Sequence, residues 1–136
     1  LAALSFKSNS LLPFWVKFNH NKLPQLAWND AQLDYDSTLS YADRPGFRCG
    51  TCFEYPAFDP VKNMSLTIRI RPLIAMECTI IEPRYLGLGL GDESLATFSE
   101  LKNNCSAVNG TFTLLWHNSF LISDEQRQIY VDVLTA

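Results

Sequence analysis

Hydrophobic and polar positions alternate along several short stretches of the chain, and each stretch predicts a β-strand. Residues 65–71 place apolar side chains on one face and Ser, Thr or Arg on the other, which is typical of a half-buried strand. Residues 73–81 are almost continuously apolar and predict a strand covered on both faces. Residues 110–119 combine threonines, aromatics and leucines without a charge and predict another buried strand. Residues 14–18 alternate well enough for a short further strand.

Three segments have the period of a helix. Residues 24–32 begin with a proline, which suits a first helical position, and continue as an apolar stripe. Residues 92–108 form a longer stripe that residues 109–110, Asn-Gly, bring to an end. Ser123 and Gln126 match a capping box at the start of the last helix. The positions expected to face the core are Leu95, Phe98, Leu101, Cys105 and Val108, then Ile129, Tyr130, Val133 and Leu134.

The segments between these elements predict loops and a fold class. Residues 33–39 predict a short extended piece. Residues 40–60 predict a loop, because proline and glycine recur there among five aromatic residues. Residues 87–91 contain three glycines and predict a flexible loop into the next helix. The order strand, helix, strand, helix in the second half predicts an α/β fold with parallel strand pairing.

Composition narrows the class of protein. The chain has 136 residues, enough for one domain, and with 47% hydrophobic and 18% charged residues it is globular rather than disordered. A net charge of -3 without a basic run argues against a nucleic-acid surface. No apolar stretch approaches the length of a membrane span. The first residue is Leu, so we expect the chain to be processed or to belong to a longer protein.

Two residues of the buried stretches are candidates for chemistry. His117 lies near the end of residues 110–119 and is followed by Asn118. Chemistry in parallel α/β folds concentrates where the loops after the strands converge. Glu77 is the one carboxylate within residues 73–81. The alternative is that the histidine is a hydrogen-bonded residue at the edge of the core.

Asp36 and Arg48 complete this candidate set. Asp36 lies in the extended piece and Arg48 in the long loop. A carboxylate and a histidine that face each other, with an arginine nearby, are the ingredients of general acid–base hydrolysis. The alternative is an Arg–Asp ion pair that ties the loop to the fold.

Four cysteines allow a further hypothesis. Cys49 and Cys52 have the spacing of a metal or redox pair, although no helix follows them and no second pair completes a zinc site. Cys78 and Cys105 occupy positions that are ordinary for buried thiols. A zinc module through the four cysteines is therefore the weakest of the functions considered.

Three separate segments together resemble the polysaccharide deacetylase family. They are Asp-Ser-Thr-Leu-Ser-Tyr-Ala-Asp-Arg-Pro-Gly-Phe-Arg-Cys-Gly-Thr-Cys at residues 36–52, Pro-Leu-Ile-Ala-Met-Glu at residues 72–77 and Leu-Trp-His-Asn-Ser at residues 115–119. They resemble most closely a bacterial branch in which a Gly-Phe-Arg-x-Gly-Thr loop is followed much later by Trp-His-Asn. The resemblance covers the chain from about Trp15 onward.

The resemblance implies a fold and an activity. It implies a distorted (β/α)7 barrel of the NodB-homology type that hydrolyses N- or O-acetyl groups on sugars. A divalent metal, expected to be zinc, would be held by an Asp and two His. His117 would be the general acid and Arg48 would orient a carboxylate, while Asp36 and Glu77 stand where related sequences often carry acids. The expected substrate contacts are Phe47, Phe53, Tyr55, Trp116 and Asn118.

The chain departs from the family in its metal ligands. It lacks the opening paired aspartates and the His-x-x-x-His helix, since its two histidines are His20 and His117. We therefore expect residues 1–136 to be the C-terminal half of such a domain and inactive alone. Its partners would be a carbohydrate and the N-terminal half, or a second copy, in the cytoplasm or cell envelope of a bacterium. The alternative is a non-catalytic sugar-binding or assembly module that uses Phe47, Phe53, Tyr55 and Phe58.

Overall fold

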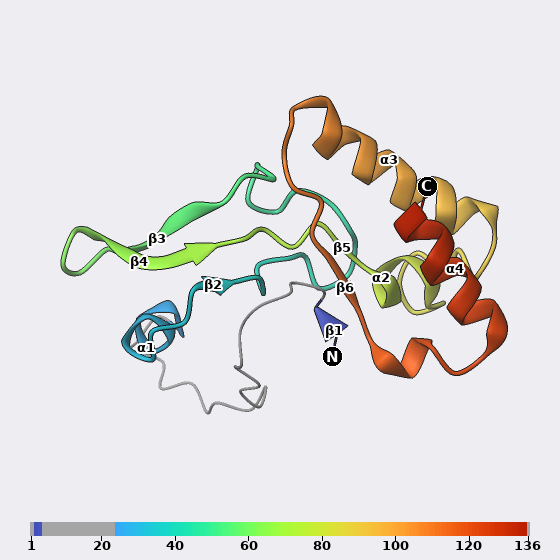
Figure 1. Ribbon diagram of the computed structural model, residues 1–136, viewed down its shortest axis with the longest axis horizontal. Helices are drawn as coiled ribbons and strands as arrows, with labels where there is room; N and C mark the ends of the chain where they lie inside the picture. The colour runs from blue at the N-terminus through green and yellow to red at the C-terminus, as the bar shows by residue number, and fades with distance from the viewer. Residues whose placement is uncertain (1, 4–23, 136) are drawn as a thin grey trace.

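Two small sheets and four α-helices form the described part of the chain, residues 2–3 and 24–135, in this computed structural model (Figure 1). The strand predicted at residues 14–18 lies outside the described residues. Among the residues described, the fold is a mixed α/β arrangement with parallel strand pairs and no closed barrel. The prediction of an α/β class with parallel pairing is therefore confirmed.

The first sheet has the strand order β1–β6–β5. Strand β6 (Leu114–Trp116) is central, pairing in parallel with β5 (Ala75–Met76) and antiparallel with β1 (Ala2–Ala3). The register aligns Ala75 with Leu114 and Met76 with Leu115. The C-terminal ends of the two parallel strands therefore lie next to each other.

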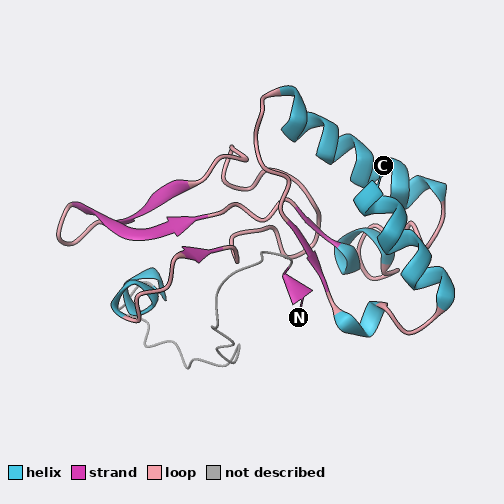
Figure 2. Ribbon diagram, in the orientation of Figure 1, coloured by secondary structure: helices cyan, strands magenta, loops and turns pink. Residues whose placement is uncertain are grey.

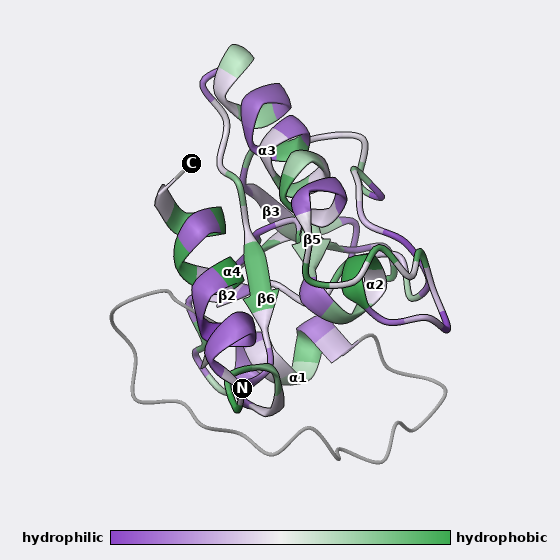
Figure 3. Ribbon diagram, turned by 90° about the vertical axis from the view of Figure 1, so that its right-hand side faces the viewer, coloured by the Kyte–Doolittle hydropathy of each residue, from purple (hydrophilic) through white to green (hydrophobic). Residues whose placement is uncertain are grey.

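Three helices cover this sheet: α2 (Glu77–Ile81), α3 (Asp92–Ala107) and α4 (Asp124–Thr135) (Figures 1 and 2). Trp116 joins the layers, with its ring 5.7 Å from that of Phe98 on α3 and 5.1 Å from that of Tyr130 on α4. Figure 3 shows hydrophobic residues on β6 and α2, in the middle of this layer. Apolar burial in this cluster is the main force that holds the helices on the sheet.

The second sheet has the order β2–β4–β3. Strand β4 (Met64–Ile70) pairs in parallel with β2 (Tyr35–Asp36) and antiparallel with β3 (Tyr55–Asp59). Its alternation buries Ile68 and Ile70 and exposes Thr67 and Arg69, which confirms the half-buried strand. Helix α1 (Pro24–Asp30) is tied to β4 because Asn29 Oδ1 accepts hydrogen bonds from the backbone N–H and hydroxyl of Thr67.

The chain connects the two sheets through segments that pair next to β5. The N–H of Leu73 donates to the carbonyl of Leu39, and the N–H of Gly46 donates to that of Ile74. Ile74, which precedes β5, and Cys105 of α3 are buried with Cys52 of the long loop in a small apolar cluster. The long loop thus packs over the core.

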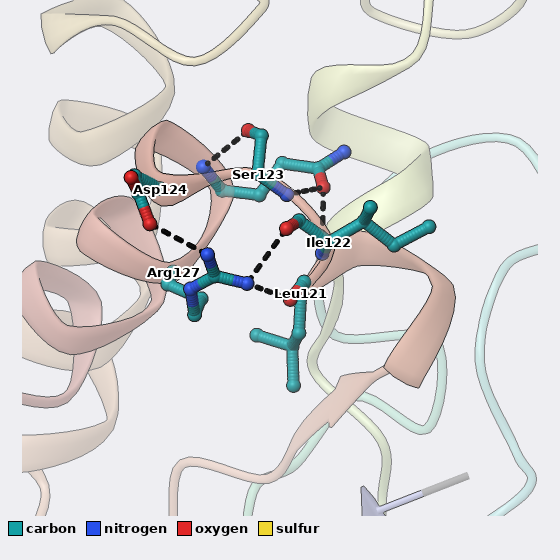
Figure 4. A network of polar contacts seen from close by, with 6 residues as sticks. Leu121, Ile122, Ser123, Asp124 and Arg127 are labelled. Atoms are coloured by element: carbon teal, nitrogen blue, oxygen red, sulfur yellow. Dashed lines mark hydrogen bonds and ion pairs between the residues drawn. The ribbon is translucent and has the colours of Figure 1, made fainter.

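The ends of the long helices follow the sequence signals. At the C-terminus of α3, the N–H of Gly110 bonds the carbonyl of Cys105 and that of Asn109 bonds Ser106, with Asn109 at φ 55°. These bonds form a Schellman motif, and the helix ends before residues 109–110, as the sequence predicted. At the N-terminus of α4, Ser123 Oγ accepts from the N–H of Gln126, whose Oε1 accepts from the N–H of Ser123 (Figure 4). The predicted capping box is confirmed.

Several sequence predictions were wrong in their details. Residues 73–81 form strand β5 and then helix α2, because a continuously apolar run does not distinguish a buried strand from a buried helix. Residues 40–60 contain β3, and only Leu114–Trp116 of residues 110–119 form a strand. Val108 and Leu134 are exposed, since each lies at a helix end beyond the packed face. No helix within the described residues is long and apolar enough to cross a membrane.

Candidate functional site

Glu77 and His117 meet where the two parallel strands end. Glu77 is the first residue of α2 and directly follows β5, while His117 directly follows β6. Because β5 and β6 are parallel and in register, the two residues lie side by side, just beyond the C-terminal ends of the strands. His117 Nδ1 lies 2.5 Å from Glu77 Oε1, across 40 residues of sequence.

The two side chains differ in exposure. The Glu77 side chain is 0% exposed, whereas that of His117 is 33% exposed. The second carboxylate oxygen of Glu77, Oε2, is buried and has no hydrogen-bond partner among the described residues. The pair therefore holds a carboxylate inside the protein and presents an imidazole at its surface.

This arrangement controls the imidazole. When Glu77 is ionised, Nδ1–H donates to Oε1, which fixes both the tautomer and the orientation of the ring. The other ring nitrogen, Nε2, is then the atom that exchanges a proton with a second partner. A carboxylate that orients an imidazole in this way is the arrangement found in many acid–base sites.

Cys78 adds a third functional group to the pair. It follows Glu77 on α2 and is buried, and ligand atoms of Glu77, Cys78 and His117 all lie within 4.8 Å of one another. Burial raises the pKa of Cys78 to about 11, and the neighbouring Glu77 charge adds to the increase. At neutral pH the side chain is therefore a thiol rather than a nucleophilic thiolate.

Asp36 and Arg48 have other partners. Asp36 is buried and accepts hydrogen bonds from Gln25 and from the N–H and hydroxyl of Thr38, so it joins α1 to β2. Arg48 is exposed and donates to the carbonyl of Ser40 at 2.6 Å. Neither forms the carboxylate–arginine contact considered from the sequence.

The loop of Arg48 contacts the chain just before β5. Gly46, two residues earlier, bonds Ile74 immediately before β5 begins. Glu77 and His117 lie immediately after β5 and β6 end. The hydrogen bond that the structure gives Arg48 is the one to the Ser40 carbonyl, rather than a contact with His117 or Glu77.

The expected substrate contacts are divided between surface and interior. Trp116 is 2% exposed, and its indole N–H donates to the carbonyl of Phe120, so the structure places it in the core. Asn118 is exposed beside His117, at the start of a short 3-10 helix (Asn118–Phe120). The core position of Trp116 fixes β6 and thereby the backbone that carries His117.

The aromatic residues of the long loop do not share one environment. Phe47 packs against the cluster of Cys52, and Tyr55 packs against the core of the second sheet. Burial raises the pKa of Tyr55 to about 12, and its hydrogen bond with Cys49 contributes. Phe53 and Phe58 are 48% and 50% exposed. Only these last two therefore present large aromatic surfaces to solvent.

The four cysteines are free thiols in separate surroundings. Cys52 and Cys105 are buried together in one apolar cluster, whereas Cys78 lies beside His117. In the described part of the chain, the one group of three ligand-type residues close enough for a metal is Glu77, Cys78 and His117. The structure therefore does not assemble the four cysteines into a zinc module.

The metal site of the deacetylase family does not fit the described residues. That site needs an Asp and two His, and His117 is the one histidine within the described ranges, since His20 lies outside them. The Glu77–Cys78–His117 group has a different set of donor atoms. We therefore derive no catalytic step from the family's metal.

No family model, curated protein or solved structure matches the chain. The resemblance to polysaccharide deacetylases therefore rests on the three quoted segments. Sequence reasoning selected Glu77 and His117 but missed Cys78, whose position directly after Glu77 was the available signal.

Proposed function

We propose that this chain supplies the acid–base part of a hydrolase that removes acetyl groups from carbohydrates. The observation that carries the proposal is the contact between Glu77 and His117 at the shared edge of β5 and β6. The resemblance of residues 36–52, 72–77 and 115–119 to polysaccharide deacetylases supplies the substrate class.

In this proposal His117 is the general acid and Glu77 is its positioning residue. Hydrolysis adds water to the acetyl carbonyl, and the bond from that carbon to the sugar nitrogen or oxygen then breaks. In its imidazolium form His117 also carries a proton on Nε2, which it would give to the departing sugar atom; the proton that the attacking water loses returns the ring to that form, and acetate would be the second product. The partial exposure of His117 suits this role, since the imidazole must reach a bulky substrate while the carboxylate of Glu77 is buried away from solvent.

The proposed enzyme also needs a complete barrel and a metal site, which Glu77 and His117 do not supply. A complete (β/α)7 barrel and the family's Asp and two His ligands would come from a further segment of polypeptide. Asp36 and Arg48 would then support the fold through their contacts with Thr38 and Ser40. On this view the chain alone has no deacetylase activity.

Acetate release from N- and O-acetylated oligosaccharides tests the proposal. We expect no release by the 136-residue chain and measurable release by a longer polypeptide that supplies the metal ligands. In that polypeptide His117→Asn should lower kcat by about 100-fold or more, the usual contribution of a general acid. Ser106→Ala, at an exposed position of α3 outside the proposed site, is the control and should retain most of the activity. Full activity of His117→Asn would reject the acid role.

A second candidate function is carbohydrate binding without catalysis. The supporting observation is the exposure of Phe53 and Phe58, since exposed aromatic rings offer apolar surface to a ligand. Calorimetric titration with oligosaccharides should then show binding that is lost in Phe53→Ala or Phe58→Ala and retained in His117→Asn. The reverse pattern would favour the hydrolase.

A further inference from the structure

The strongest candidate outside the acid–base chemistry is the combination of Cys78 with Glu77 and His117. These residues offer a thiol sulfur, a carboxylate oxygen and an imidazole nitrogen, all within 4.8 Å of one another. Zn²⁺ binds these three donor types in proteins, usually with tetrahedral geometry. Glu77 and Cys78 come from the start of α2, and His117 comes from the loop after β6.

An independent observation concerns the second oxygen of Glu77. Oε2 is fully buried and has no hydrogen-bond partner among the described residues. A buried, unpartnered carboxylate oxygen is costly, because it has lost its hydration without gaining another interaction. A bound cation would supply that interaction.

We propose that Glu77, Cys78 and His117 form a site for a thiophilic divalent cation, with Zn²⁺ as the best-fitting ion. The sulfur donor disfavours Mg²⁺ and Ca²⁺, which prefer oxygen ligands. Three protein ligands leave a fourth position for water or another small ligand. The partly exposed His117 provides the side from which the ion enters.

Binding requires a small local change. His117 Nδ1 and Glu77 Oε1 are 2.5 Å apart, whereas two ligands of one tetrahedral zinc ion with bonds of about 2.1 Å lie about 3.4 Å apart. The pair must therefore separate by about an ångström, which rotation of the exposed imidazole can provide. Cys78 binds as a thiolate, so its proton passes to solvent, and the imidazole carries its proton on the nitrogen that does not bind.

The proposed cation competes with the acid–base role. An imidazole bound through Nδ1 is no longer oriented by Glu77, so zinc at this second site should inhibit the hydrolase, and Cys78→Ser should relieve that inhibition. This consequence rests on the proposed function, whereas binding of the ion does not. Zinc binding by the chain, together with no acetate release by the longer polypeptide, would support the site and reject the enzyme.

Titration of the chelator-treated chain with Co²⁺ tests the site directly. We expect one equivalent to bind, with a thiolate-to-cobalt charge-transfer absorption that Zn²⁺ abolishes by displacement. Cys78→Ser should remove this absorption, and Glu77→Gln or His117→Asn should weaken binding more than about tenfold. Cys49→Ser is the control, because Cys49 lies outside the Glu77–Cys78–His117 group. The charge-transfer absorption of this variant should equal that of the original chain.

A measurement on the original chain tests the site even if the variants fail to fold. X-ray absorption at the zinc edge of the loaded protein should show one sulfur and two or three nitrogen or oxygen neighbours. A shell without sulfur, or with several sulfurs, would overturn the proposal. So would a charge-transfer band that persists in Cys78→Ser, or the absence of stoichiometric Co²⁺ binding by the original chain.

Discussion

Glu77 is the residue on which the chemistry of the site depends. Its side chain is buried, one oxygen contacts His117 and the other lacks a partner among the described residues. An apolar residue of similar volume would fill the position without the cost of burying a charge. We therefore infer that Glu77 serves the orientation of the imidazole rather than the stability of the fold.

Gly110 illustrates a different constraint on a single residue. A Cβ atom at this position would lie 2.2 Å from Cys52 Sγ, so even alanine must displace the buried thiol. We expect Gly110→Ala to lower the free energy of unfolding by about 1–3 kcal/mol, the usual cost of overpacking. In a Cys52→Ala background the same substitution should cost clearly less, as urea denaturation of the four proteins would measure. Equal costs in both backgrounds would contradict the contact.

Titration of the Cys105 thiol should lower the stability of the fold at alkaline pH. Burial raises its pKa from the ordinary 9.0 to about 12, and the adjacent Cys52 adds to the increase. The folded thiol holds its proton more tightly than the unfolded thiol, so this contribution is complete below about pH 9 and is lost as the pH rises toward about 12. The free energy of unfolding should therefore fall between about pH 9 and about pH 12.

Cys105→Ala provides the matched comparison for this pH dependence. The variant should be less stable at neutral pH, because it leaves a small cavity, but its stability should fall less steeply over the alkaline range. Ser106→Ala, at an exposed position and without loss of a thiol, should keep the steeper profile. Parallel profiles for Cys105→Ala and the original chain would contradict the assignment.

Helix α4 depends on its first turn. Ser123 caps the helix, and Arg127 donates to the carbonyls of Leu121 and Ile122 while contacting Asp124, so the turn is held from several sides (Figure 4). This helix supplies Ile129 and Val133 to the core around Trp116. Its capping therefore supports the strand that carries His117.

Ser123→Ala should destabilise the protein by about 1 kcal/mol, because it removes the side-chain acceptor for the N–H of Gln126. Thermal or urea denaturation would show the change. Ser106→Ala, at an exposed position near the end of α3, is the control and should have little effect, since alanine is the better helix former. A neutral Ser123→Ala would indicate that the other contacts of this turn are sufficient.

The two sheets of the whole molecule have different roles. The first sheet carries the Glu77–His117 pair, whereas the second, with α1 and the projecting β3–β4 hairpin, surrounds a core of its own (Figure 1). The long loop joins them through Cys52 and Ile74. Arg48 belongs to this joint, through its bond to Ser40, rather than to the pair.

The sequence predicted the local features of this molecule better than its distant contacts. The strand within residues 65–71 and both helix caps were recognised, because alternation and capping residues act within a few positions. Residues 73–81 were assigned entirely to a strand, since their apolar texture reports burial and not backbone type. His117 and Glu77 were chosen separately, but the contact between them depends on the register of β5 and β6, which no local pattern encodes.

The orientation of the His117 ring by Glu77 is the central claim, and NMR of the imidazole nitrogens tests it most directly. Long-range ¹H–¹⁵N spectra distinguish the two tautomers of a neutral histidine. Glu77→Gln is the informative variant, because it removes the charged acceptor from Nδ1 with little change in volume. Arg48→Ala is the control, because Arg48 is paired with Ser40.

We predict that His117 of the original chain carries its proton on Nδ1, donated to Glu77, and that Glu77→Gln shifts the ring toward the other tautomer. Arg48→Ala should leave the spectrum of His117 unchanged. A histidine with its proton mainly on Nε2, and with the same spectrum in the original chain and in Glu77→Gln, would contradict the pairing on which the proposed chemistry is built.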